Sequence, residues 1–401
     1  MRFSLRAGGI LSAIGLAIGL AALPSPASAA VIGCTVTDLK AAINAANSGG
    51  GTISLFPGCT YSLNSVDNDS NGLPVITAAV TIYGNGATIE RATGSPLFRI
   101  FEVGGPAGNL TLNTLTVRNG DLDSSADGGG ILVDSGRKLT IQSGSTVTGN
   151  TANNGGGIFS NGTTTVTAST ISKNTASGFG GGIGVSGGGS LTLTATTVTQ
   201  NTGNFSGGLG FDTGTTGTIQ SSFITKNTAN VNGGGLANDG TLTVRSSYFT
   251  GNTAGGDGGG LANDKSLTLT GSVFTDNSAN RGAGLANFSA SGQATIGGTL
   301  FLSNKATTSG GGLLTRDSAS TTLNSSVAEV NEAGISGGGL ATLNGSSATL
   351  NSTAVVANKA GTTAGGIFNS ASTTTLNSSP VVANNPNNCV GSSPPVAGCI
   401  G

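Results

Sequence analysis

Two aspartates at equivalent positions of adjacent sequence repeats are the best candidates for acid–base chemistry. Asp239 and Asp264 each follow an asparagine, in Asn238-Asp239 and Asn263-Asp264. If the repeats stack as parallel strands, the two carboxylates lie about 5 Å apart. Glycoside hydrolysis requires two convergent carboxylates, so this pair carries catalysis if the chain is an enzyme. The chain has no histidine for general acid–base work, and we therefore favour solvated turn acids over an active site.

A calcium loop is the second candidate site. The run Asp67-Asn68-Asp69-Ser70-Asn71-Gly72 matches the first half of an EF-hand loop, with Asp67, Asp69 and Asn71 as the Ca²⁺ ligands. The twelfth position is Ala78, where an EF-hand has the bidentate glutamate. An Asx-rich turn is the alternative interpretation, and it is the one we favour. We expect no other cofactor.

These residues are positioned by a repeat that occupies most of the chain. Two or three small residues, mostly glycine, precede an Ile or Leu ten times between Gly128 and Ile367, at steps of 24 to 28 residues. An asparagine keeps the same spacing, at Asn150, Asn174, Asn201, Asn227, Asn252, Asn277, Asn304, Asn331, Asn358 and Asn384. Two independent markers on one period predict a solenoid.

The composition of each repeat favours strands over helices. Glycine and β-branched residues dominate, and alternating runs such as Leu191-Thr192-Leu193-Thr194 predict strands with Leu inward and Thr outward. The residue three positions before each marker asparagine, from Val147 to Val381, is large and apolar in nine of ten repeats. We therefore predict an all-β parallel β-helix of about 26 residues per coil, with three strands per coil and a stacked asparagine ladder that satisfies turn backbone.

The ends of the chain carry signals of export and capping. Arg2, Arg6, an apolar run and Ala27-Ser28-Ala29 indicate a signal peptide. Four cysteines form two local pairs, for which we favour the disulfides Cys34–Cys59 and Cys389–Cys399. Residues 38–46 have apolar residues at helical spacing and predict a short helix over the N-terminal end.

The predicted organisation has four parts: a signal peptide at 1–29, a cap with irregular first coils at 30–127, regular repeats at 128–384, and a disulfide-closed tail at 385–401. No later apolar segment is long enough to cross a bilayer. Only 8% of residues are charged and the formal net charge is −1, so there is no basic stripe for nucleic acid. The oligomeric state is not predicted.

The repeat resembles that of polymorphic outer membrane proteins. Gly-Gly-x-[Ile/Leu] alternates with Phe-x-x-Asn, as in Phe249-Asn252. The segment after Cys34, with Leu39-Lys40-Ala41-Ala42-Ile43, is similar to the Cys-Ser-Leu-Arg-Glu-Ala-Ile segment that often precedes such repeats, although Ala41 replaces the glutamate. The resemblance implies the right-handed β-helix of the pectate-lyase-like superfamily and an adhesin-like role. It does not imply outer-membrane residence, because the translocating barrel of those proteins is not seen here.

Three functions remain open from the sequence. The first is a secreted, non-catalytic surface or extracellular β-helix that binds glycan or another cell-surface ligand along one solenoid face. The second is a polysaccharide lyase or hydrolase that uses Asp239 and Asp264. The third is binding of ice or a crystal surface by outward threonine rows such as Thr192 and Thr194 or Thr268 and Thr270, although threonine is also simply a good strand residue.

Overall fold

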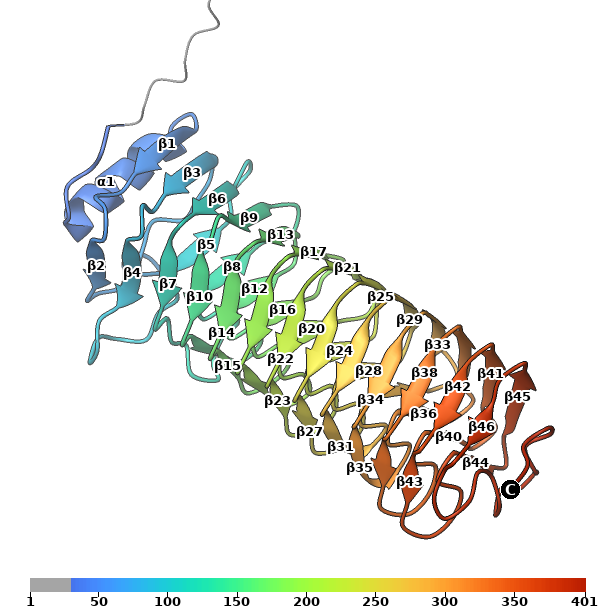
Figure 1. Cartoon of the computed structure of the whole chain (residues 1–401). Helices are drawn as coiled ribbons and strands as arrows, with labels where there is room; N and C mark the ends of the chain where they lie inside the picture. The colour runs from blue at the N-terminus through green and yellow to red at the C-terminus, as the bar shows by residue number, and fades with distance from the viewer. Residues whose placement is uncertain (1–29) are drawn as a thin grey trace, which may run out of the picture.

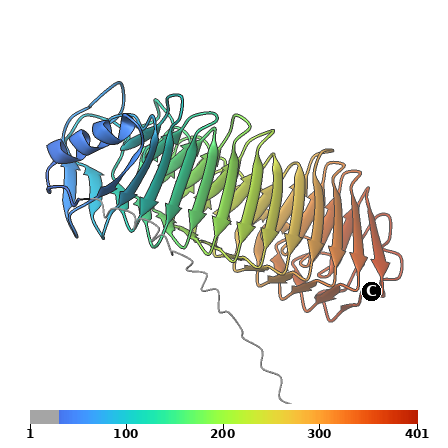
Figure 2. The ribbon, with the colours of Figure 1, turned by 90° about the horizontal axis from the view of Figure 1, so that it is seen from above.

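The computed structural model describes residues 30–401, which form a straight rod of stacked parallel coils (Figure 1). The signal peptide expected at 1–29 lies outside the described residues. Successive coils add strands to four sheets, and each sheet runs along the rod with its strands side by side (Figure 2). Every pairing between named strands is parallel, which is the arrangement that the repeat predicts.

The first sheet contains thirteen strands, and its side chains alternate between the core and solvent. In β17, for example, Leu191 and Leu193 are buried whereas Thr192 is exposed. The strands are β1 (Gly51–Ser54), β3 (Ala79–Tyr83), β6 (Asn109–Asn113), β9 (Lys138–Gln142), β13 (Thr163–Thr167), β17 (Ser190–Thr194), β21 (Thr216–Gln220), β25 (Thr241–Arg245), β29 (Ser266–Thr270), β33 (Gln293–Gly297), β37 (Ser320–Asn324), β41 (Ser347–Asn351) and β45 (Thr373–Asn377).

The second sheet also has thirteen strands, and it supplies the apolar column three residues before each marker asparagine. Phe249, Phe274 and Phe301 stack in this column with ring centroids 4.5 and 5.2 Å apart. The strands are β2 (Thr60–Leu63), β4 (Thr88–Arg91), β7 (Thr116–Arg118), β10 (Thr146–Thr148), β14 (Thr170–Ser172), β18 (Thr197–Thr199), β22 (Phe223–Thr225), β26 (Tyr248–Thr250), β30 (Val273–Thr275), β34 (Leu300–Leu302), β38 (Val327–Glu329), β42 (Ala354–Val356) and β46 (Val381–Val382).

The third sheet shows that the prediction of three strands per coil was wrong, because the regular coils have four. Directly after the marker asparagine, pairs such as Thr151-Ala152 and Thr175-Ala176 hydrogen-bond from coil to coil. Two residues are too few for an alternating pattern to be visible in sequence. The strands are β11 (Thr151–Ala152), β15 (Thr175–Ala176), β19 (Thr202–Gly203), β23 (Thr228–Ala229), β27 (Thr253–Ala254), β31 (Ser278–Arg281), β35 (Lys305–Ser309), β39 (Glu332–Ala333) and β43 (Lys359–Ala360).

The fourth sheet follows the glycine-rich marker in each coil. Its first residue, the Ile or Leu of the repeat, is fully buried in the regular coils, as Leu209 and Leu236 are. The strands are β5 (Phe101–Val103), β8 (Ile131–Val133), β12 (Ile158–Ser160), β16 (Ile183–Val185), β20 (Leu209–Phe211), β24 (Leu236–Asn238), β28 (Leu261–Asn263), β32 (Leu285–Phe288), β36 (Leu313–Arg316), β40 (Leu340–Leu343) and β44 (Ile367–Ser370).

The ten marker asparagines form one continuous buried ladder. The Asn174 side-chain oxygen accepts from the backbone N–H and the side-chain amide of Asn150, at 3.0 and 2.9 Å. The Asn174 amide in turn donates to the Val147 carbonyl at 3.1 Å. Each later asparagine repeats this pattern with its neighbours. At the start of the ladder the Gly120 N–H donates to the Asn150 side-chain oxygen, and at its end the Asn384 amide donates to the Asn388 side-chain oxygen.

Both ends of the rod are covered. Helix α1 (Val36–Asn47) begins at its N-cap Thr35, whose hydroxyl accepts from the Asp38 N–H at 3.1 Å, and its face of Leu39, Ile43 and Ala46 is buried against the first coils. It starts two residues before the predicted helix and ends one residue later. The structure forms both predicted cysteine pairs, with Cα–Cα distances of 5.9 Å for Cys34–Cys59 and 6.3 Å for Cys389–Cys399.

Substitution of one asparagine side chain tests the contribution of the ladder to stability. In Asn252→Ala, the Asn227 N–H and one hydrogen of the Asn227 amide lose their acceptor, and the Ile224 carbonyl loses the Asn252 amide as a donor. A buried group without its hydrogen bond costs about 1–3 kcal/mol, so we expect about 3 kcal/mol or more of destabilisation. Guanidinium unfolding of the variant should show a clearly lower midpoint. Asn324→Ala is the control: Asn324 accepts a bond from Asn351 on the outer face of the first sheet. Equal midpoints for the two variants would contradict the structural role of the ladder.

Candidate functional site

Three carboxylates stand in one column at the ends of fourth-sheet strands. Asp212, Asp239 and Asp264 directly follow β20, β24 and β28, and the residues before them are paired in register. Adjacent strands are about 4.8 Å apart, so the three turns are stacked along the rod. From the sequence, Asp239 and Asp264 were predicted to occupy equivalent positions, because each follows an asparagine. Asp212 was missed because Phe211 precedes it where the other two repeats have asparagine.

A second buried amide ladder holds these turns. The Asn238 amide donates to the Asn263 side-chain oxygen and the Asn263 amide to that of Asn287, both at 2.7 Å. Asn238 also accepts from the Gly240 N–H at 3.2 Å, which fixes the backbone on the far side of Asp239. Sequence reasoning missed this ladder. The recurring Leu-Ala-Asn at 236–238, 261–263 and 285–287 was the signal that could have revealed it.

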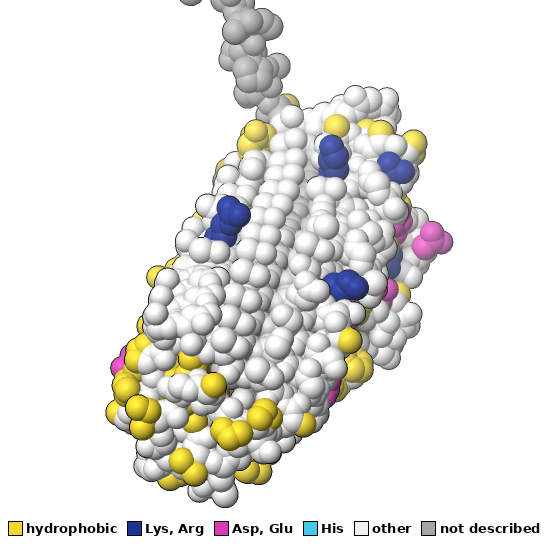
Figure 3. All heavy atoms as spheres, turned by 90° about the vertical axis from the view of Figure 1, so that its right-hand side faces the viewer, with side chains coloured by type: hydrophobic (Ala, Val, Ile, Leu, Met, Phe, Trp, Pro, Cys, Tyr) yellow, Lys and Arg dark blue, Asp and Glu magenta, His cyan; other side chains and the backbone are white. Residues whose placement is uncertain are grey.

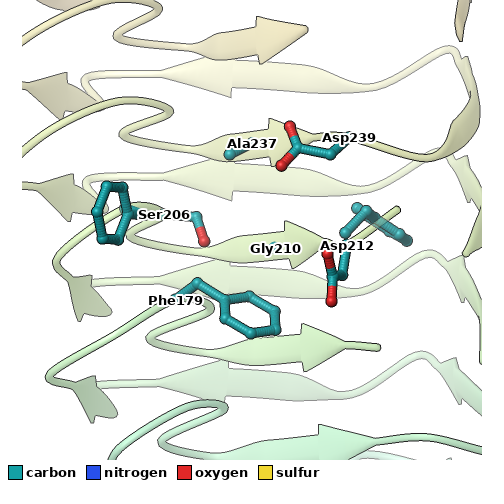
Figure 4. Close-up of a pocket in the computed structure, with 8 residues that line it drawn as sticks. Phe179, Ser206, Gly210, Asp212, Ala237 and Asp239 are labelled. Carbon is teal, nitrogen blue, oxygen red and sulfur yellow. The ribbon is translucent and has the colours of Figure 1, made fainter. Parts of the chain in front are cut away.

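A pocket of about 300 Å³ lies beside the first two carboxylates (Figure 4). Phe179 and Ser206 lie on one side of it in the close-up, and Asp212 and Asp239 lie on the other. Gly210 and Ala237, the outward residues of β20 and β24, form the surface between them. Phe205 also lines the pocket, and 52% of its surface is exposed. The pocket therefore combines an accessible aromatic ring with hydrogen-bond acceptors.

The surface between the two walls has to be made of small residues. A Cβ added to Gly210 would lie 2.5 Å from both the Phe179 ring and the Ser206 hydroxyl. The Phe179 ring also contacts Phe159 edge-on, with centroids 5.9 Å apart. The outward position stays small in the next coils, with Ala237 and Ala262 in register with Gly210. Glycine and alanine thus keep this side of the fourth sheet open to a ligand.

The carboxylates of the column differ in their partners. Asp212 accepts from the Ser186 hydroxyl and from the Thr213 N–H, both at 2.7 Å. In residues 30–401, none of the three forms a salt bridge. Desolvation within the pocket, followed by repulsion from Asp264 and then Asp212, raises the pKa of Asp239 to about 6. Asp239 therefore holds a proton in mildly acidic solution.

Of the three predicted calcium ligands Asp67, Asp69 and Asn71, the first and the last contact positively charged side chains of the protein. Asp67 forms a salt bridge with Lys40 at 2.9 Å. The Asn71 side-chain oxygen accepts from Arg99 at 2.8 Å, and its amide donates to Glu102 at 3.0 Å. Two of the three proposed ligands are thus already bound to cations of the protein. Among the described residues there is no cluster of three or more acidic, histidine or cysteine side chains that could hold a metal ion.

The stacked coils and their buried ladders define the protein as a parallel β-helix. Residues 105–301 match a family model described as "Right handed beta helix region". The fold is therefore the right-handed parallel β-helix that the sequence predicts, and the same coils continue on both sides of the matched segment. Comparison with curated proteins and with solved structures gave no match to this chain. None of the helices in the described part of the chain is long and apolar enough to cross a membrane.

The raised pKa of Asp239 makes stability depend on pH. The pKa of about 6 in the folded protein lies above the ordinary aspartate value of 3.8. The contribution of Asp239 to the free energy of unfolding is therefore complete below about pH 4 and is lost as pH rises past 6. We expect the unfolding midpoint of Asp239→Asn to fall less than that of the wild type between pH 4 and pH 7. Urea unfolding at a series of pH values measures this. Asp276→Asn, an exposed acid outside the column, should follow the wild type; parallel curves for all three proteins would disprove the assignment.

Proposed function

We propose that this protein is an exported, non-catalytic β-helix that binds a neutral polysaccharide chain in the pocket over the fourth sheet. One observation carries the proposal: the exposed Phe205 lines the same pocket as Asp212 and Asp239, two carboxylates without a salt bridge, and the pocket lies over a surface of glycine and alanine. Sugars present apolar C–H faces, which stack on aromatic rings, and hydroxyls, which donate to carboxylates. Phe205 offers the first kind of contact, and Asp212 and Asp239 offer the second.

The charge of the pocket indicates the class of polysaccharide. Asp212, Asp239 and Asp264 form an acidic wall that lacks a salt bridge within the described residues. A polymer of uronic acids would meet like charges there, and like charges brought together without a counter-ion repel. A neutral chain meets only acceptors for its hydroxyls. Two disulfide-bonded cysteine pairs fit an oxidising, extracellular environment, where such chains occur.

Hydrolysis of the bound chain is the second candidate function, and the raised pKa of Asp239 is the observation that favours it. A carboxyl with a raised pKa, as Asp239 has, can hold the proton that a general acid donates, and Asp264 is the second carboxyl beside it. However, the two carboxyls of a glycosidase flank the scissile bond. Asp239 and Asp264 follow neighbouring parallel strands and stand in one wall, so both would lie on the same side of a chain in the pocket. We therefore favour binding over cleavage.

Removal of the exposed ring tests the proposal. Phe205→Ala should weaken binding of neutral oligosaccharides by about two- to tenfold, because an aromatic contact contributes about 0.5–1.5 kcal/mol. Glycan-array screening of the purified protein, followed by calorimetric titration of the best ligand, measures the effect. Phe223→Ala is the matched control: Phe223 is 46% exposed and lies on the outer face of the second sheet. Equal affinities for the two variants would place binding elsewhere.

A reducing-end assay on the same oligosaccharides separates the two functions. We expect no new reducing ends from the wild type. Release of sugar that disappears in both Asp239→Asn and Asp264→Asn would contradict the non-catalytic proposal and establish the pair as catalytic.

A further inference from the structure

The outer face of the first sheet carries an unbroken column of threonines. Each of the thirteen strands has threonine at the same register position, and each pairs with the threonines of the neighbouring coils. All are exposed or half-buried. They are Thr52, Thr81, Thr111, Thr140, Thr165, Thr192, Thr218, Thr243, Thr268, Thr295, Thr322, Thr349 and Thr375. We call this column and the outward columns on either side of it the threonine face.

The preference for exposed β-branched residues in strands does not account for this column. The two neighbouring outward columns have the same backbone and a comparable exposure, yet their residues vary from coil to coil. One includes Ala79, Asn109, Lys138 and Gln293, and the other includes Tyr83, Gln220, Arg245 and Gly297. Repetition of a sequence unit would have kept all three columns alike. Only the middle column stays threonine, even in the irregular first coils.

The threonine face is large and almost uncharged. Its strands are about 4.8 Å apart and its columns about 6.7 Å apart, so thirteen rows and three columns give an area on the order of 1,000 Å². A stable interface needs about 800 Å² from each partner. Lys138 and Arg245 are the charged residues of the three columns. Figure 3 shows the side of the rod toward which β33, β41 and β45 lie, and most of that surface is neither charged nor hydrophobic.

The hydroxyls of the middle column are available to a ligand. None of these thirteen side chains, all within the described residues, hydrogen-bonds to another protein group in the way that Ser190 and Thr163 do in a neighbouring column. A protein partner would have to remove water from all of them, and burial of a hydroxyl without a hydrogen bond is costly. A solid polysaccharide exposes apolar ring faces that bind aromatic side chains, and Tyr83 at one end is the aromatic residue of this face. Ordered water instead gives each hydroxyl a partner.

We propose that the threonine face binds the surface of ice. A two-dimensional array of hydroxyls matches a ligand that is itself periodic in two dimensions, uncharged, and able to donate and accept at every site. The face is also ordered before binding. Threonine has few side-chain rotamers, and all but the terminal strands are hydrogen-bonded on both edges, so little conformational entropy is lost on binding. This site lies on a different sheet from the pocket, and the inference does not depend on the proposed polysaccharide function.

Ice-affinity measurement of the purified protein tests the inference. Ice is grown slowly in a dilute protein solution, and the fraction of protein taken into the ice is compared with that of a protein that does not bind ice. The wild type should be enriched in the ice. The triple variant Thr140→Lys, Thr165→Lys, Thr192→Lys places three long charged side chains on the threonine face, and we expect its enrichment to fall to the level of the non-binding protein.

The matched control introduces the same three changes in the same three coils, on the second sheet. Thr146, Thr170 and Thr197 are outward threonines of β10, β14 and β18, also paired in register. The control should enter ice like the wild type, and circular dichroism melts should show that both triple variants are folded. Exclusion of the wild type from ice, equal enrichment of the two variants, or retention on crystalline cellulose alone would overturn the inference. Phe205→Ala, which tests the pocket, should leave ice enrichment unchanged.

Discussion

Each coil of this rod is held in register with the next by an asparagine amide whose hydrogen bonds run to neighbouring coils. The Asn227 side chain accepts two bonds from Asn201 and donates to Asn252 and to the Val198 carbonyl. A slip of one residue would turn each strand over and leave these amides without partners in the core. The apolar stack of Phe249, Phe274 and Phe301 is aligned by the same register, although apolar contacts alone are not directional.

Because the register is fixed, the backbone is nearly the same in every coil. The chemical character of the surface changes from coil to coil only through the side chain that occupies each register position. The column that contains the three aspartates continues in the later coils with Phe288 and Arg316. Arg316 points its charge at the buried Asp257, with Nε 3.0 Å from the carboxylate, and lies over the Phe288 ring at 5.1 Å. In that part of the rod the acid is compensated and the outer face of the fourth sheet is covered. In the coils around Asp239, by contrast, Asp212 and Asp239 line a pocket and form no salt bridge with any described residue.

The sequence predicts what repeats in every coil. The asparagine ladder, the inward column from Val147 to Val381 and the outward threonines are visible because each occurs many times at one spacing. The pocket is not, since Phe179 and Phe205 come from turns that differ between coils, and only the stacked structure brings them to Asp239. The contacts of the predicted calcium loop were missed for a related reason. Its ligands were read as neighbours in sequence, whereas Lys40 and Arg99, which occupy two of them, lie about 30 residues away.

Because the ladders link neighbouring coils, the number of coils in this rod can change during evolution. In the regular coils, the backbone pairing and the asparagine hydrogen bonds join each coil to the one before and the one after, while α1 and the tail around Cys389 and Cys399 cover the two ends. Duplication or loss of a single coil in the gene would therefore let both ladders close again and leave both caps in place. The length of the rod, and with it the extent of its outer faces, can change in steps of one layer over generations while the three coils that form the pocket stay intact.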